Sequence, residues 1–149
     1  MSLPVAFSSS AAGPAVVIDD RIRLRFAEQD RLAIRTHFAD HGAAVEEMSS
    51  FIGIAANANI LFDVGADRGI FSLVFCGSGD RKRAVAYEPS PSRFAAATAL
   101  AALNACDGRL MLRQAALEIR TAGRAGPPSP MGPWSLALTI RPAPPPTSR

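Results

Sequence analysis

Long apolar runs and a positively charged leader are both missing from this sequence. No window approaches the roughly 20 consecutive apolar residues that cross a membrane. No basic residue precedes Arg21, whereas a secretory signal would begin with positive charge. We therefore expect a soluble, cytoplasmic protein with no membrane partner.

Metal-binding and disulfide-forming residues are equally scarce. The only two cysteines, Cys76 and Cys106, show no C-x-x-C spacing, so neither a zinc site nor a disulfide framework is indicated. Their apolar neighbours favour two small buried side chains. His37 and His41 lie four residues apart, a separation that suits one metal ion on a helix. No motif supplies a third ligand, and "HFADH" lacks the glutamate of the zinc-protease pattern, so surface histidines are the favoured interpretation.

Concentrated positive charge is also missing, although the formal net charge is +3. The sixteen basic residues are scattered along the chain, and Lys82 is the one lysine among them. A nucleic-acid surface usually gathers basic charge together with aromatic residues. Only "DRKR" (residues 80–83) comes near that pattern, and we interpret it as a solvated turn. No nucleic-acid partner is expected.

Composition divides the 149 residues into four segments. Residues 1–14, rich in Ser, Ala and Gly, predict a flexible leader. Residues 15–58 predict a hairpin, in which Ile22, Leu24 and Phe26 alternate with arginines, followed by helices over 27–42 and 43–58. Residues 59–125 hold the core. The proline-rich residues 126–149 predict a poorly ordered tail, in which the apolar island "WSLALTI" fits either a strand or tail.

A regular alternation of strands and helices begins at Asn59. The stretches "NILFDV", "AVAYE" and "RLMLRQAAL" predict strands, and "IFSLVFCG" and "RFAAATALAALNAC" predict helices. Ser90 suits the N-cap of the second helix, with Pro91 at its first position. Strands that alternate with helices favour a parallel sheet. The predicted fold class is α/β, with a Rossmann-like, doubly wound, mostly parallel sheet flanked by helices.

Two acidic turns carry the functional prediction. In "DVGADRG", Gly65 lets the backbone leave the strand without a side chain in a ligand's path, and Gly69 lets the next helix approach the sheet. Asp63 ends its strand, where it can accept amide hydrogens of the loop or meet a ligand cation. Glu88 ends the next strand, 23 residues after Gly65. A carboxylate there can accept hydrogen bonds from both vicinal hydroxyls of a ribose.

The first turn favours a nucleoside cofactor that carries no phosphate. The dinucleotide fingerprint G-x-G-x-x-G holds a pyrophosphate on backbone amides. Asp67 replaces its middle glycine, and a negative charge is unfavourable beside phosphates. S-adenosylmethionine has a ribose and no phosphate, so it is the predicted cofactor.

Two alternatives from other classes stay open. One is a catalytically inactive or truncated module that retains an adenosine pocket. The other is a fragment of a nicotinamide-dependent oxidoreductase, which is disfavoured by Asp67 and by the lack of a Tyr-x-x-x-Lys pair.

Three stretches, "FDVGADRGIFSLVF", "AVAYEPSPSRFAAATALAALNA" and "LMLRQAAL", resemble the cofactor-binding half of the FkbM family of class I S-adenosylmethionine-dependent methyltransferases. That family typically reads DVGAN-x-G at the first turn, aromatic-Glu-Pro at the end of the second strand, and Leu-Asn at the close of the next helix. The resemblance covers about residues 59–117. It implies an incomplete class I methyltransferase fold.

The resemblance also implies roles for individual residues. Asp63, Gly65 and Gly69 would shape the methionine end of the cofactor pocket, and Glu88 would hold the ribose. The other predicted cofactor-binding residues, which lie in the same motifs, are Ala66, Asp67 and Pro89. Asp67 stands where the family usually has Asn, which adds a charge and removes a hydrogen-bond donor.

The activity implied by the resemblance is O-methyl transfer to a small-molecule or sugar-type hydroxyl. No residue of the sequence identifies itself as the catalytic base, and the oligomeric state is not indicated. The expected partner is the small-molecule methyl acceptor.

Overall fold

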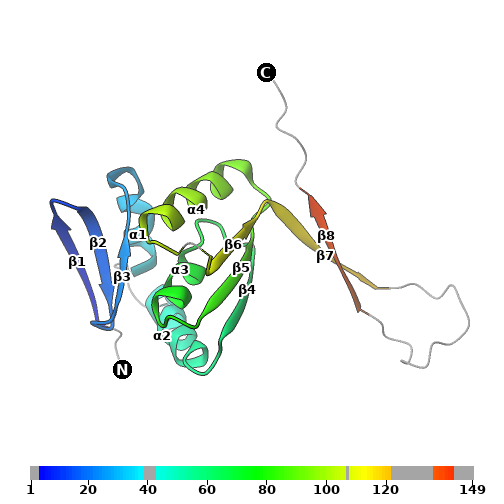
Figure 1. The fold of residues 1–149 in the computed structure, drawn as a ribbon, viewed down its shortest axis with the longest axis horizontal. Coiled ribbons are helices and arrows are strands. Elements are labelled where there is room, and N and C mark those ends of the chain that lie inside the picture. The colour runs from blue at the N-terminus through cyan, green and yellow to red at the C-terminus, as the bar shows by residue number, and fades with distance from the viewer. Residues whose placement is uncertain (1–3, 39–42, 107, 122–135, 143–149) are drawn as a thin grey trace, which may run out of the picture.

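The computed structural model describes residues 4–38, 43–106, 108–121 and 136–142. An antiparallel sheet, a parallel sheet with its helices, and a β-hairpin follow one another along the chain (Figure 1). The predicted α/β class is therefore present in the described residues.

The N-terminal sheet consists of β1 (Val5–Ser10), β2 (Gly13–Ile18) and β3 (Ile22–Arg25), which pair antiparallel in that order. The predicted hairpin forms, with Ile18 opposite Ile22 across the turn. The sequence does not predict β1, and a flexible leader is the wrong description of residues 5–10. Phe7 of β1 packs edge-on against Phe26, with ring centroids 6.4 Å apart. This aromatic contact draws a serine-rich segment into the sheet.

Three helical segments follow the N-terminal sheet: η1 (Glu28–Asp30), α1 (Arg31–Phe38) and α2 (Ala43–Ala55). The predicted helix over 27–42 is therefore interrupted near its start and described only as far as Phe38. His37 packs edge-on against Phe71, with ring centroids 6.5 Å apart. His41 lies outside the described residues, and within them no group of three or more His, Cys, Asp or Glu side chains gathers as metal ligands would.

The parallel sheet contains β4 (Ile60–Val64), β5 (Arg83–Tyr87) and β6 (Leu110–Arg113), in the order β4-β5-β6. Phe62 pairs with Val85, which pairs with Met111. The connections are α3 (Ile70–Gly77) and α4 (Pro91–Leu103), close to the predicted helices. The apolar runs and the glycine and proline positions explain why β4, α3, β5 and α4 begin and end close to their predicted bounds.

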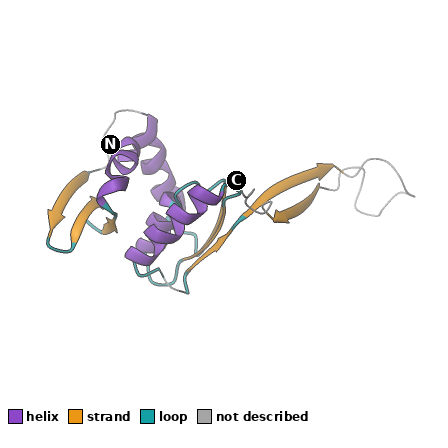
Figure 2. Ribbon diagram, turned by 90° about the horizontal axis from the view of Figure 1, so that it is seen from above, coloured by secondary structure: helices purple, strands orange, loops and turns teal. Residues whose placement is uncertain are grey.

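Helices α3 and α4 pack on one face of this sheet (Figure 2). Ala84 and Ala86 are buried beneath them, whereas Ile60, Phe62 and Val64 are 62%, 67% and 59% exposed on the other face. A doubly wound sheet has helices on both faces, because the chain reverses direction past the first strand. Within the described residues no strand pairs with the outer edge of β4, so the expected double winding is not found there.

One hydrophobic core joins the N-terminal sheet to the helices of the parallel sheet. Its members from the two regions include Val16, Leu24, Ile34, Phe75 and Leu100. Gly77 of α3 lies so close to β3 that an added Cβ would meet Ile22 Cγ2 at 3.0 Å. The segments predicted as 15–58 and 59–125 therefore share one interior.

The side chain of Asn104, just after α4, attaches this helix to the N-terminal sheet. Its Oδ1 accepts a hydrogen bond from the Arg25 amide at 2.7 Å, and its Nδ2 donates to the Arg25 carbonyl oxygen at 2.9 Å. Nδ2 also donates to the Leu100 carbonyl oxygen at 2.7 Å. Asn104 therefore continues the pairing of β3 and satisfies a carbonyl at the end of α4.

The "DRKR" run contains one buried residue, so a solvated turn is the wrong description of Lys82. This lysine is 8% exposed, and its ammonium donates to the carbonyl oxygens of Ala55, Ala56 and Ala58. The Nζ atom also lies 4.8 Å from the centroid of the Phe75 ring. A cation is stable here because carbonyl oxygens at the end of α2 and just beyond it carry partial negative charge, and the ammonium gives them a charged donor.

Both cysteines are buried, as their apolar neighbours predict, and neither forms a disulfide. The Cys76 thiol donates to the Arg109 carbonyl oxygen at 3.6 Å. A hydrogen bond with the Cys106 thiol, together with burial, raises the pKa of Cys76 well above its ordinary value. The Cys76 thiol is therefore a poor nucleophile in the folded protein.

The last described elements form a β-hairpin that projects beyond the parallel sheet (Figure 1). A single strand is predicted over 109–117, but β6 ends at Arg113 and β7 (Ala115–Thr121) pairs antiparallel with β8 (Leu136–Pro142). Most of the island "WSLALTI" lies in β8. The prediction of a poorly ordered tail is therefore wrong for residues 136–142, and the rest of that tail lies outside the described residues.

None of the helices that the structure describes has the length and apolar character needed to cross a bilayer.

Candidate functional site

The two acidic turns meet at the carboxyl edge of the parallel sheet. Because β4 and β5 are parallel neighbours, with Val64 opposite Tyr87, the segments that follow them leave the sheet on the same side. We call residues 65–69 the glycine corner. The amides of Gly65 and Ala66 both donate to the Tyr87 carbonyl oxygen, at 2.9 and 3.0 Å. The corner therefore folds over the end of β5, where Glu88 follows.

Three residues of the glycine corner have left-handed backbone. The φ angles of Gly65, Asp67 and Gly69 are 77°, 52° and 72°. Glycine adopts such angles freely, and Asn and Asp tolerate them better than most other residues. The left-handed backbone at position 67 therefore favours an aspartate there over most other residues. An added Cβ at Gly69 would meet Ala97 at 3.6 Å, an ordinary contact, so φ is what requires this glycine rather than the close approach that the sequence suggested.

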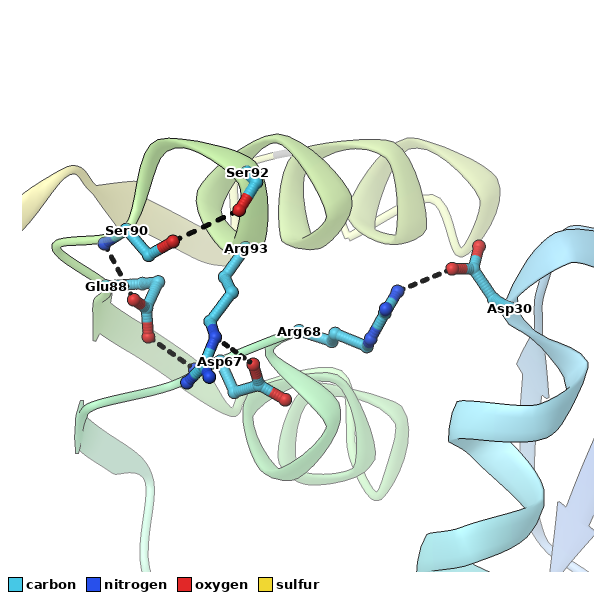
Figure 3. A network of polar contacts seen from close by, with 7 residues as sticks. All are labelled: Asp30, Asp67, Arg68, Glu88, Ser90, Ser92 and Arg93. Carbon is cyan, nitrogen blue, oxygen red and sulfur yellow. Dashed lines mark hydrogen bonds and ion pairs between the residues drawn. The ribbon is translucent and has the colours of Figure 1, made fainter. Parts of the chain in front are cut away.

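Glu88 is buried and links the corner to the start of α4 (Figure 3). Its Oε2 accepts a hydrogen bond from the Asp67 amide at 2.9 Å, and its Oε1 accepts one from the Ser90 amide at 2.8 Å. A carboxylate oxygen has two lone pairs, so each oxygen retains one further acceptor position. The Glu88 carboxylate therefore meets the glycine corner, whereas cofactor binding by these residues stays a prediction.

The start of α4 has the predicted residues without the predicted hydrogen bond. Ser90 occupies the N-cap and Pro91 follows it, but the Ser90 side chain makes no capping hydrogen bond. Its Oγ lies 3.2 Å from Ser92 Oγ instead, and its amide is bound by Glu88. Pro89 is exposed between Glu88 and this cap.

Asp63 lies partly buried on the face of β4 that α3 covers. Its Oδ2 accepts a hydrogen bond from Ser72 Oγ at 2.7 Å, and Ser72 is fully buried. This hydrogen bond goes to α3, whereas the sequence suggested the amides of the corner. Burial raises the pKa of Asp63 above its ordinary value, and the hydrogen bond from Ser72 opposes that change. The carboxyl is therefore a partly desolvated acid next to the corner.

Two ion pairs hold the charged side chains of the corner (Figure 3). Asp67 Oδ1 lies 3.3 Å from Arg93 Nε of α4, and Arg68 Nη1 donates to Asp30 Oδ1 at 2.6 Å. Arg93 offsets part of the Asp67 charge on which the exclusion of phosphate ligands depends. The sequence indicates neither partner, because a contact between a turn and a distant helix leaves no periodic signal along the chain.

A groove of about 500 Å³ opens beside Asp63 and Gly65. It lies between α2, β4 and the first turn of α3. Its lining residues are Glu47, Ser50, Phe51, Ile54, Leu61, Phe62, Asp63, Val64, Gly65 and Phe71. The sequence does not indicate Glu47 and Ser50, since the pattern of α2 alone cannot say which of its faces meets β4. The groove combines aromatic and aliphatic walls with two carboxylates, as small-molecule sites often do.

Comparison with known proteins adds no assignment. A scan against protein-family models finds no match, and a search among curated proteins finds none either. The functional conclusion therefore depends on the residues of the corner, Glu88 and the groove.

Proposed function

We propose that this chain binds S-adenosylmethionine at the carboxyl edge of the β4-β5-β6 sheet, as an FkbM-type class I methyltransferase would. The observation that carries the proposal is the hydrogen bond from the Asp67 amide to Glu88 Oε2. It holds a glycine corner and a buried carboxylate around one point at the ends of two parallel strands, which is where α/β sheets bind nucleosides.

The roles of the residues follow from their positions. The acceptor positions that remain on the Glu88 carboxylate receive the two ribose hydroxyls. Gly65 is exposed, and apart from its two chain neighbours no residue comes within 4 Å of the place where its Cβ would stand, so the methionine end of the cofactor can approach its backbone. Asp63 supplies negative charge that favours a cationic ligand group nearby.

Methyl transfer is the reaction that this cofactor supplies when bound, by in-line displacement at its sulfonium methyl group. The contribution of the chain would be alignment of the acceptor with that methyl group. The groove between α2 and β4 begins at Asp63 and Gly65, so we place the small-molecule or sugar-type hydroxyl acceptor there. In this proposal β4, β5 and β6 correspond to the first three strands of a class I methyltransferase sheet.

A second candidate function is an inactive module that binds the cofactor without turnover. The observation that favours it is the outer edge of β4, where a complete class I sheet would continue and with which no strand of the described residues pairs. Cofactor binding is common to both candidates, so binding is the property to test first.

Calorimetric titration with S-adenosylhomocysteine and, separately, with NAD tests the proposal. We expect S-adenosylhomocysteine to bind at least about tenfold more tightly, because a pyrophosphate would lie near Asp67. Preference for NAD would overturn the methyltransferase proposal in favour of a dinucleotide site. Binding of S-adenosylhomocysteine without methyl transfer to any hydroxyl acceptor would favour the inactive module.

A further inference from the structure

The side chain of Arg68 leaves the glycine corner and reaches the N-terminal part of the fold (Figure 3). Its Nη1 donates to Asp30 Oδ1 at 2.6 Å. Asp30 ends the short helix η1, and its amide donates to the Ala27 carbonyl oxygen at 2.9 Å. Asp30 is 8% exposed. Solvent therefore screens this ion pair less than a pair on the surface.

Side-chain contacts fix the glycine corner from different directions, and this contact is one of them. The Asp67 amide is held by Glu88, and the Asp67 carboxylate lies 3.3 Å from Arg93 Nε. These two contacts tie the corner to the end of β5 and to α4. The Arg68 contact ties it to residue 30, which is 38 positions away in the sequence. The corner is therefore attached on both of its sides.

The position of Arg68 within the corner gives this attachment its importance. Arg68 stands between Asp67 and Gly69, which both have left-handed backbone. A left-handed φ at a residue other than glycine costs free energy and persists only where the surroundings enforce it. An anchored side chain at the next position restrains the backbone that presents the Asp67 amide to Glu88.

We propose that Asp30 is a positioning residue for the cofactor site, acting through Arg68. It keeps the corner in the conformation in which the Asp67 amide meets Glu88 and the remaining acceptor positions of Glu88 face the ligand. The ligand part of this inference rests on the proposed function. The inference extends the site to a residue outside every motif of the sequence, and it makes the N-terminal part of the fold a component of the cofactor pocket.

A neighbouring ion pair provides a matched control. Glu28 pairs with Arg31 in the same short segment, and these side chains are 69% and 36% exposed. The side-chain hydrogen bonds of this pair join its two members to each other rather than to the glycine corner. Glu28→Gln therefore removes an acid of the same region without removing a support of the corner.

The test uses hydrogen exchange of the corner amides without ligand and, separately, titration with S-adenosylhomocysteine. We expect Asp30→Asn and Arg68→Gln each to speed exchange of the Asp67 amide about tenfold, the ratio that corresponds to loss of a charged hydrogen bond. We expect them to weaken S-adenosylhomocysteine binding about three- to tenfold, because the ligand must then order the corner. The double variant should add little to either single change. Asp30→Glu, which keeps the charge, should recover part of the affinity, and Glu28→Gln should change neither readout.

The outcomes separate this inference from the proposed function. Asp30→Asn with wild-type exchange at the corner would overturn the positioning role, as would an equal rise in exchange throughout β5 and α4. If the wild-type chain does not bind S-adenosylhomocysteine, the proposed function fails, and the exchange measurement still decides whether Asp30 positions the corner. If Asp30→Asn does not fold, Arg68→Gln provides the same decision.

Discussion

At the scale of single residues, Asp63 carries a conflict between stability and binding. Burial raises its pKa above the ordinary value of 3.8. The folded protein therefore binds this proton more tightly than the unfolded chain does. The stability that this tighter binding contributes is present below the ordinary pKa and is lost as the pH rises through the raised pKa of the folded protein. A partly buried carboxylate that lowers stability at neutral pH is typical of residues that are retained for function.

Replacing Asp63 with asparagine separates these two effects. We expect Asp63→Asn to unfold at a higher temperature than the wild type at pH 7, because the amide keeps an acceptor for Ser72 and removes the charge. The difference should shrink as the pH falls towards 3.8. The same variant should bind S-adenosylhomocysteine more weakly.

Thermal denaturation over a series of pH values checks the prediction for Asp63. Asp80→Asn, which alters an exposed loop acid, serves as the control and should leave the unfolding temperature unchanged. An Asp63→Asn variant that is less stable than the wild type at pH 7 would contradict the raised pKa.

Glu88 is expected to contribute both to stability and to binding, since its carboxylate accepts hydrogen bonds from two backbone amides. In Glu88→Gln one of its two acceptor oxygens becomes an NH2 donor, so we expect a loss of about 1–2 kcal/mol in the free energy of unfolding. We also expect S-adenosylhomocysteine to bind about tenfold more weakly, because a charged hydrogen bond to the ribose is lost. Urea denaturation and calorimetry measure the two effects, again with Asp80→Asn as the control. Unchanged affinity would remove Glu88 from the site.

At the scale of elements, the end of α2 depends on Lys82. Its ammonium donates to the carbonyl oxygens of Ala55, the last residue of α2, and of Ala56 and Ala58 just beyond it, and the aromatic ring of Phe75 lies beside it. A single side chain therefore joins the end of α2 to the connection before β5, although it contributes nothing to the candidate site.

Substitution of Lys82 tests this contribution. We expect Lys82→Met to lower the free energy of unfolding by about 1–3 kcal/mol, because three buried or partly buried carbonyl oxygens lose a charged donor while the apolar stem is kept. The exposed neighbour Arg81→Met should stay within about 0.5 kcal/mol of the wild type. Denaturation in urea compares the two variants, and equal stability would refute the capping role.

The elements differ in how far the sequence predicts them. The apolar periodicity and the positions of Gly65, Gly69 and Pro91 locate β4, α3, β5 and α4, because these signals are local. The parallel pairing of β4 with β5 explains why Glu88, which follows β5, lies next to the corner that follows β4. Lys82, Arg93 and Asp30 could not be predicted to act as they do, because each contact joins elements whose relative placement no local pattern records.

At the scale of the whole molecule, one face of the parallel sheet is left without helices. Alternating strands and helices predict the parallel sheet, but the faces that the helices occupy depend on strand order, which the alternation does not fix. Phe62 and Met111 lie in one row across this face and are 67% and 51% exposed. Parallel sheets are usually covered on both faces, and their strands therefore carry apolar side chains on both. A face that is left uncovered is for this reason unusually apolar.

The uncovered face should bind a hydrophobic reporter dye. We expect the chain to enhance the fluorescence of anilinonaphthalene sulfonate, and Phe62→Ser combined with Met111→Ser to reduce it strongly. The free energy of unfolding should change by less than about 1 kcal/mol, because both side chains are largely exposed already. Loss of several kcal/mol would mean that these side chains are packed in solution.

The central claim is that the glycine corner and Glu88 hold one ribose between them. The most direct measurement is a nuclear magnetic resonance titration of the 15N-labelled chain with S-adenosylhomocysteine, following the amides of Asp67 and Ser90. Both amides donate to the Glu88 carboxylate, so we predict that their resonances shift together and saturate at one ligand, while the Arg23 amide in the N-terminal sheet stays unchanged. A saturating titration that leaves the Asp67 and Ser90 resonances in place, or no response at all, would contradict the account.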